Sequence, residues 1–182
     1  MPDANQLITG DARSNSRQWY AAYTIVRHEK KAVSHLEIRG IETFLPLYGS
    51  TRNWNGRRAK VHLPLFPGYL FVFIHACDRF RVLEAPSIVR LIGNNGKLTP
   101  LPETEVQALK ASLQLQSSRP SPFFAAGRRV QIKSGPLRGL TGVVVREARE
   151  LRVVIKIETI MQSFSVELDS GDLEPCFTSE RH

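Results

Sequence analysis

One short segment constrains the fold of this chain more than any other. Residues 64–74 read Pro-Leu-Phe-Pro-Gly-Tyr-Leu-Phe-Val-Phe-Ile. The Pro-Gly pair predicts a turn, and the aromatic and branched residues after it predict a β-strand. The strand period of two sorts the side chains into two faces, with Tyr69, Phe71 and Phe73 on one and Leu70, Val72 and Ile74 on the other. Neither face is polar, so either helices cover both sides of this strand or one aromatic face is kept for a partner.

Length and composition limit the class of protein. A chain of 182 residues can form one large or two small domains with a real core. No apolar stretch approaches the ~20 residues of a membrane helix, and residues 1–16 are polar, without the apolar region of a secretion signal. We therefore expect a disordered tail at 1–16, no membrane association and a cytoplasmic location. Cys77 and Cys176 are expected to be free thiols, although a single disulfide between them stays open.

The net charge of +8 is unevenly distributed. Residues 17–116 carry 14 Lys and Arg against 7 Asp and Glu, whereas residues 123–182 carry 9 against 8. An acidic partner is therefore more plausible for the N-terminal part, with a merely solvated surface as the alternative.

Periodicity and turn residues divide the chain into two structured parts. The first part is expected to contain, in order, a strand at 19–26, a helix at 29–39, a strand at 41–48, a hairpin around Asn55-Gly56, a short helix that Asp78 caps and Pro86 ends, a strand at 88–92 and a helix at 102–116. The Ser- and Pro-rich residues 117–122 predict a linker between two domains. Short strands beyond it, at 129–133, 141–146, 151–158 and 162–168, predict a small closed barrel.

Catalytic chemistry has no support in the sequence. The five histidines are scattered, and no His, Cys or carboxylate spacing suits a metal ion. The chain also has no glycine-rich phosphate loop and no nucleophile elbow. We expect a protein that is not an enzyme and that needs neither a cofactor nor a metal.

A second informative segment lies at residues 127–144. Hydrophobic alternation places Val130 and Ile132 inward, and Gly135-Pro136 predicts a turn. Two further glycines, Gly139 and Gly142, permit tight bends beside the next strand. This pattern resembles a KOW motif, which occurs in ribosomal proteins and in transcription elongation factors.

Together the two segments resemble the NusG family of bacterial transcription elongation factors. The resemblance also rests on Trp19-Tyr20 in the first strand and on Glu29-Lys30-Lys31 at the start of the first helix. Residues 44–48, Trp54 and residues 132–137 look closest to the specialised UpxY-like (RfaH-type) paralogues. The implied fold is α+β: an NGN domain at 17–116, with a four-stranded antiparallel sheet flanked by helices, and an SH3-like KOW β-barrel at 123–177.

The resemblance implies three contact surfaces on the N-terminal domain. An apolar pocket for the clamp coiled-coil of the largest RNA polymerase subunit would comprise Phe66, Tyr69, Phe71 and Leu91, although plain core residues would give the same pattern. Contacts to the non-template DNA of the transcription bubble would come from Lys30, Lys31, His35 and Arg39 on the helix and Trp54, Arg57 and Arg58 on the hairpin. Contacts to the opposite side of the polymerase cleft would come from Arg79, Phe80 and Arg81, unless Phe80 packs inward.

The C-terminal part departs from the family at one loop. General NusG proteins carry a Phe-Gly-Arg-type loop linked to the termination factor Rho and to a small-subunit ribosomal protein, and this chain has Thr-Ile-Met-Gln-Ser at 159–163. The departure argues against Rho recruitment, while the ribosomal protein stays a candidate partner of the KOW domain. Valine-rich runs at 143–145 and 153–155 favour strands, so this domain is expected to stay a barrel and not to refold into helices.

These observations predict a monomeric antitermination or elongation factor without chemistry of its own. It would bind elongating polymerase, bridge the clamp and suppress pausing or termination, for dedicated operons. The alternative is a ribosome-associated RNA-binding protein that uses its KOW domain. The near-neutral charge of residues 123–182 argues against that alternative, because phosphate contacts need cations.

Overall fold

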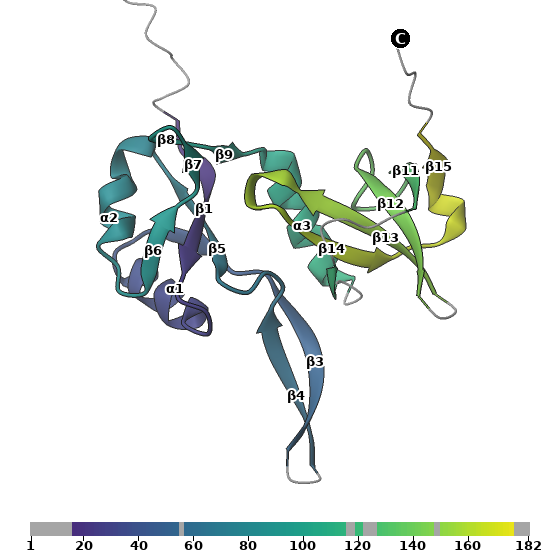
Figure 1. The fold of residues 1–182 in the computed structure, drawn as a ribbon, viewed down its shortest axis with the longest axis horizontal. Coiled ribbons are helices and arrows are strands. Elements are labelled where there is room, and N and C mark those ends of the chain that lie inside the picture. The colour runs from purple at the N-terminus through teal and green to yellow at the C-terminus, as the bar shows by residue number, and fades with distance from the viewer. Residues whose placement is uncertain (1–15, 55–56, 116–118, 122–126, 148–149, 177–182) are drawn as a thin grey trace, which may run out of the picture.

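The structure is a computed structural model that describes residues 16–54, 57–115, 119–121, 127–147 and 150–176. Figure 1 shows an N-terminal sheet with helices, a two-stranded arm that projects from them, and a set of C-terminal strands. Helix α3 lies between the N-terminal sheet and the C-terminal strands (Figure 1).

The N-terminal sheet is antiparallel and has the strand order β2-β5-β1-β6. Its strands are β1 (Gln18–Thr24), β2 (Glu42–Phe44), β5 (Tyr69–Ile74) and β6 (Ile88–Leu91). A fifth short strand, β9 (Pro100–Leu101), pairs with the beginning of β1 and extends the four-stranded sheet that the sequence predicts. In the central pair, Trp19 lies opposite Phe73 and Ala21 opposite Phe71.

Two helical segments cover one face of this sheet. Helix α1 (Glu29–Ile38) places Ala32 and Leu36 against Leu70, Val72 and Ile74, and the short α2 (Arg79–Leu83) adds Val82. These apolar side chains are all buried, which confirms that one face of β5 belongs to the core. Asp78 occupies the N-cap position of α2, but its side chain makes no capping hydrogen bond and lies instead 3.7 Å from the guanidinium of Arg81.

Helix α3 (Glu103–Gln114) covers part of the opposite face. It begins after Pro102, where a missing N–H costs nothing, and it buries Val106, Ala108 and Leu109. These residues join Trp19, Leu65, Phe66 and Phe71 in one apolar cluster. The second apolar face of β5 is therefore also covered.

The segment expected as one strand at 41–48 is interrupted. Pro46 separates β2 from β3 (Leu47–Trp54), which pairs only with β4 (Arg57–Pro64) in a separate two-stranded sheet. The pairing Trp54↔Arg57 confirms a hairpin, while the Asn55-Gly56 turn itself lies outside the described residues. A smaller hairpin joins β7 (Gly93–Asn94) to β8 (Lys97–Leu98).

The C-terminal domain is a six-stranded antiparallel sheet in the order β10-β14-β13-β12-β11-β15. The four predicted strands are present as β11 (Arg128–Ile132), β12 (Thr141–Glu147), β13 (Glu150–Ile157) and β14 (Gln162–Glu167). Two three-residue strands were not predicted: β15 (Leu173–Pro175), and β10 (Arg119–Ser121), which lies within the segment expected as a linker and pairs with β14. Short 3-10 turns, Ala76–Asp78 before α2, Glu158–Ile160 and Ser170–Asp172, connect strands and helices.

The KOW-type turn between β11 and β12 has the predicted geometry. Val130 and Ile132 are buried, and Gly135 and Gly139 have φ values of +76° and +89°. The Gly139 N–H donates to the Ile132 carbonyl at 2.7 Å, which closes the turn around Pro136. A Cβ on Gly142 would lie 2.4 Å from Val153 Cγ1 and 2.8 Å from the Val154 carbonyl oxygen, so the two strands approach closely only because this residue has no side chain.

Candidate functional site

The turn before β5 is fixed to the start of α1. Gly68 has a φ of +83°, and its N–H donates to Glu29 Oε1 at 2.8 Å inside the protein. The Thr24 N–H donates to the Gly68 carbonyl at 2.8 Å, and the Tyr69 N–H donates to the Phe66 carbonyl at 3.0 Å. The Pro67-Gly68 pair therefore positions the Phe66 ring on the same side of the sheet as Phe71.

An aromatic cluster occupies that side of the sheet. Phe66 and Phe71 are 0 % exposed, and their rings meet edge to face with centroids 6.4 Å apart. Phe44 stacks on Phe71 at 6.0 Å, and Trp19 lies 5.1 Å from Phe73. Edge-to-face and offset stacking are the favoured arrangements of aromatic pairs, so the cluster is a defined surface of the N-terminal domain.

The C-terminal domain covers this aromatic cluster. Phe164 on β14 meets the Phe66 ring with centroids 6.3 Å apart and an interplanar angle of 66°. Ile160, in the turn before β14, is buried in the same apolar cluster. Part of the cover over the aromatic face thus comes from the C-terminal domain.

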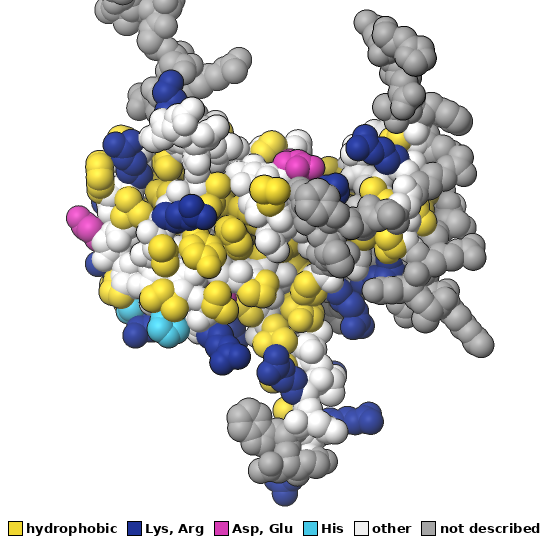
Figure 2. Space-filling view, viewed as in Figure 1, with side chains coloured by type: hydrophobic (Ala, Val, Ile, Leu, Met, Phe, Trp, Pro, Cys, Tyr) yellow, Lys and Arg dark blue, Asp and Glu magenta, His cyan; other side chains and the backbone are white. Residues whose placement is uncertain are grey.

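Tyr69 lies at the rim of the cluster and is only half-buried. Its ring contacts that of Tyr23 at 5.2 Å, and the guanidinium of Arg90 lies 5.6 Å from the Tyr23 ring centroid. Ile25 and Val26 in the segment after β1, and Val89 on β6, are each about half exposed. Figure 2 shows hydrophobic side chains gathered over the N-terminal sheet.

Leu91 is not part of the aromatic cluster, which corrects the prediction that grouped it with Phe66, Tyr69 and Phe71. It lies opposite Ala22 in the β1–β6 pair and packs on the side covered by α1 and α2. Its neighbour Ile92 packs against the aromatic cluster instead. Residues that lie directly opposite each other on paired strands share a face of the sheet. Because Leu91 pairs with Ala22, it lies on the face that α1 and α2 cover, and a shift of one residue would place it on the aromatic face.

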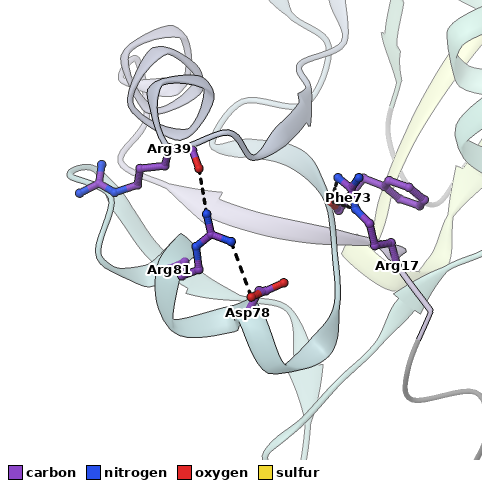
Figure 3. A network of polar contacts seen from close by, with 5 residues as sticks. All are labelled: Arg17, Arg39, Phe73, Asp78 and Arg81. Atoms are coloured by element: carbon purple, nitrogen blue, oxygen red, sulfur yellow. Dashed lines mark hydrogen bonds and ion pairs between the residues drawn. The ribbon is translucent and has the colours of Figure 1, made fainter.

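The end of α1 and the start of α2 form one cationic surface. Arg81 donates to the Arg39 carbonyl at 3.0 Å, as Figure 3 shows. Arg39 in turn reaches the carbonyls of His35 at 3.3 Å and Glu84 at 3.5 Å. Phe80 is 60 % exposed, so it does not pack inward, and the Arg79 guanidinium lies 4.8 Å from its ring centroid.

Residues expected to contact DNA and residues expected to contact the polymerase cleft are therefore neighbours. His35 and Arg39, expected at DNA, adjoin Arg79 to Arg81, expected at the far side of the polymerase cleft. Lys30 and Lys31 are exposed at the opposite end of α1. Figure 3 also shows Arg17, which precedes β1 and donates to the Phe73 carbonyl of β5 at 2.7 Å.

The β3–β4 arm carries more cations than the hairpin tip alone predicts. Arg57 and Arg58 are exposed, as are Arg52 and Lys60, which sequence reasoning missed. A signal was available, because residues 47–64 contain no Asp or Glu. The pairs Asn53↔Arg58 and Thr51↔Lys60 share one face of the arm and Arg52↔Ala59 the other, so cations lie on both faces. Figure 2 shows Lys and Arg side chains along the arm.

A groove of about 530 Å³ lies at the base of the arm. Thr51, Lys60 and His62 line it from the arm, and Leu113 lines it from α3. The side chain of Trp54, expected as a stacking group on this arm, lies outside the described residues. The groove and the arm together present hydroxyl and cationic groups without a carboxylate.

Comparison with known proteins identifies the family. The family model described as "Transcription termination factor nusG" matches residues 17–110, which is more than half of the chain. The chain belongs to the NusG family. A NusG from Thermus thermophilus, a "Transcription termination/antitermination protein", is 28 % identical over 176 residues, covering 85 % of this chain and 96 % of that protein. The NusG of Escherichia coli K12 is 24 % identical over 173 residues, covering 87 % and 96 %.

A solved structure supports the same fold. The structure described as "Domain interaction in Thermotoga maritima NusG" aligns with a TM-score of 0.58 and 22 % identity, covering 89 % of this chain and 98 % of that one. The chain is thus a transcription termination/antitermination factor of the NusG family with an NGN domain and a β-rich C-terminal domain. The family match favours this assignment over a ribosome-associated protein, while closeness to the UpxY-like paralogues stays a prediction.

The loop at residues 158–161, expected from the sequence to differ from that of general NusG proteins, takes part in the contact between the domains. Residues 158–160 form a 3-10 turn in which Ile160 is buried, and Met161 follows with a φ of +51° and an exposed side chain.

In the part of the chain that the structure describes, no three His, Cys, Asp or Glu side chains are gathered as metal ligands. No helix in that part is long and apolar enough to cross a membrane.

Proposed function

We propose that this NusG-family chain binds elongating RNA polymerase through the aromatic cluster, by way of the clamp coiled-coil of the largest subunit. The observation that carries the proposal is the complete burial of two aromatic rings, those of Phe66 and Phe71. Removing one such ring from water is worth about 1.5–3 kcal/mol, so these rings need a cover in every state of the protein. Phe164 of the C-terminal domain covers Phe66 here, and polymerase would supply that cover in the complex.

This proposal requires the C-terminal domain to leave the aromatic cluster before polymerase binds. The exposed apolar rim at Tyr69, Val26 and Val89 would provide a first contact while the domains are still docked. Leu91 has no place in this pocket, and Ile92 replaces it.

Contact to the opposite side of the polymerase cleft is assigned to Arg79, Phe80 and Arg81, because an exposed phenylalanine beside two arginines is a ready protein-binding group.

Non-template DNA is the second partner in this proposal. Lys30, Lys31, His35 and Arg39 on α1 would contact its phosphates, and so would the arm through Arg57 and Arg58, now joined by Arg52 and Lys60. Cations on both faces of the arm allow phosphates to approach from two directions. By holding the polymerase clamp and the DNA together, the factor would suppress pausing or termination on dedicated operons. It would act as a monomer in the cytoplasm. A small-subunit ribosomal protein stays a candidate partner of the C-terminal domain, and Rho is not expected.

Tyr69 provides the test, because it is half-buried at the rim and can be changed with little damage to the core. Tyr69→Arg should lower the affinity for core polymerase at least about tenfold, since an arginine in an apolar contact is left unpaired. Ile38→Arg is the matched control: Ile38 is 83 % exposed on α1, away from the cluster, and its exchange should leave binding unchanged. Unchanged binding of a folded Tyr69→Arg protein would refute the pocket, and sedimentation with ribosomes but not polymerase would favour the alternative.

A further inference from the structure

One oxygen of a carboxylate at the contact between the two domains has no hydrogen-bonding partner among the described residues. Glu105 is on the first turn of α3, and among the described residues nothing bonds to its buried Oε2 atom. The side chain lines a groove of about 480 Å³ together with Arg129, Lys156 and Glu158 of the C-terminal domain. It also lines a smaller cavity of about 110 Å³ that Phe164 and Ile155 close from the same domain. The burial of Glu105 therefore depends on the docking of the C-terminal domain.

A second carboxylate, Glu158 of the C-terminal domain, lines the same groove. Glu158 begins the 3-10 turn that carries Ile160 into the apolar contact. Burial raises the pKa of Glu105 above the usual range of a glutamate, and the charge of Glu158 raises it further. The N-terminus of α3 favours an ionised carboxylate, but burial outweighs this effect.

The other charged groups around Glu105 come from each element packed against it. Arg129 on β11 and Lys156 on β13 line the groove, and the Cys176 thiol lies at its edge after β15. On α3 itself, Glu103 accepts a hydrogen bond from Gln107 at 2.6 Å. The Lys110 ammonium lies 4.6 Å from the Trp19 ring centroid and is engaged with that ring. None of these groups provides Oε2 with a hydrogen bond.

We propose that Glu105 and Glu158 form a titratable latch that sets how readily the two domains separate. When both carboxylates are ionised, their repulsion and the burial of Glu105 weaken the docked state. When Glu105 takes up a proton, both penalties disappear and the domains hold together more tightly. The inference deepens the proposed function, because undocking is the step that would free the aromatic cluster for polymerase.

The direction of the pH effect follows from linkage. A carboxylate whose pKa is higher in the docked than in the undocked state binds its proton more tightly when docked. Docking is therefore strongest below the ordinary glutamate pKa, weakens as the pH rises through the raised pKa of the docked state, and stays constant above it. A rise in pH through that range thus favours the form that opens more easily.

The test measures docking itself in the full chain. The methyl resonances of Ile160, which shares an apolar cluster with Phe66 of the other domain, should carry ring-current shifts from the Phe66 ring when the domains are docked, and should lose them on separation. At a pH above the titration of Glu105, Glu105→Gln should raise the docking equilibrium constant severalfold, because a neutral amide has neither the burial penalty of the carboxylate nor its repulsion by Glu158. It should also remove most of the pH dependence of docking above the ordinary glutamate pKa. Glu158→Gln should act in the same direction with a smaller effect.

Glu103→Gln is the matched control, since it removes the same charge from the same turn of α3 on the exposed side. It should leave docking and its pH dependence unchanged. The latch is refuted if Glu105→Gln weakens docking or leaves it unchanged, or if Glu103→Gln strengthens it equally. Because polymerase is absent from this measurement, a failure of the proposed polymerase contact would not affect its outcome.

Discussion

At the scale of single residues, Gly68 shows most clearly how a local rule supports the whole site. Its positive φ and its hydrogen bond to Glu29 fix the turn that presents Phe66. A Cβ at this position would lie 3.0 Å from the Tyr23 ring and 3.4 Å from Val26 Cγ2. Both strain in the backbone and a steric conflict therefore oppose any other residue here.

We expect Gly68→Ala to lower the free energy of unfolding of the N-terminal domain by about 1–3 kcal/mol. Gly49→Ala is the control, because a Cβ there meets nothing within 4 Å and the residue has no positive φ. Urea denaturation followed by tryptophan fluorescence measures both. Equal stability of the two variants would contradict the account of this turn.

Glu29 is the buried partner of that turn. Its side chain is almost fully buried at the start of α1 and accepts the Gly68 N–H. Glu29→Ala should cost about 1.5–3 kcal/mol in the same denaturation experiment, because the exchange leaves the Gly68 N–H without its charged acceptor. Glu37→Ala, at an exposed position of the same helix, should cost less than about 0.5 kcal/mol. A similar cost for both would show that the hydrogen bond adds nothing.

Residue patterns predicted which side chains lie together, but not always on which side. The alternation in β5 correctly separated Leu70, Val72 and Ile74 from Phe71. Leu91 was assigned to the wrong side because the register of β6 against β1 depends on a long-range pairing that includes a shift at Tyr23. Sequence alone does not contain that register.

At the scale of elements, helices and long strands followed from local signals. Both long helices begin and end within two residues of the predicted positions, since periodicity and end signals agree there. Pro46 divides the predicted strand at 41–48, an effect that the proline itself signalled. The three-residue strands β10 and β15 carry no pattern of their own and form only because a partner strand is present.

The arm is the element with the clearest prediction. Lys60→Glu on one face and Arg52→Glu on the other should each weaken the binding of single-stranded bubble DNA, since the two faces carry cations independently. Each exchange should reduce the slope of log affinity against log salt by about 0.7, the value for one contact to a single-stranded phosphate. Fluorescence anisotropy measures this, with Lys97→Glu on the exposed β7–β8 hairpin as the control. A loss at only one face would show that DNA contacts a single side of the arm.

At the scale of the whole molecule, both apolar faces of strand β5 are covered within the protein. One face is covered by α1 and α2, and the other by α3 together with the C-terminal domain. The sequence predicted both domains but could not predict their contact. That contact depends on the complementarity of surfaces far apart in the chain, such as Phe66 and Phe164.

The central claim is that polymerase and the C-terminal domain compete for the same aromatic cluster. The most direct measurement is the affinity of core polymerase for the full chain carrying Phe164→Ala, compared with the unmodified chain and with docking followed by methyl NMR. Loss of the ring that meets Phe66 should weaken docking and tighten polymerase binding about threefold to thirtyfold, because less of the docked state has to be displaced. If the domains separate in this variant and the affinity for polymerase stays the same or falls, the aromatic cluster is not the polymerase-binding surface.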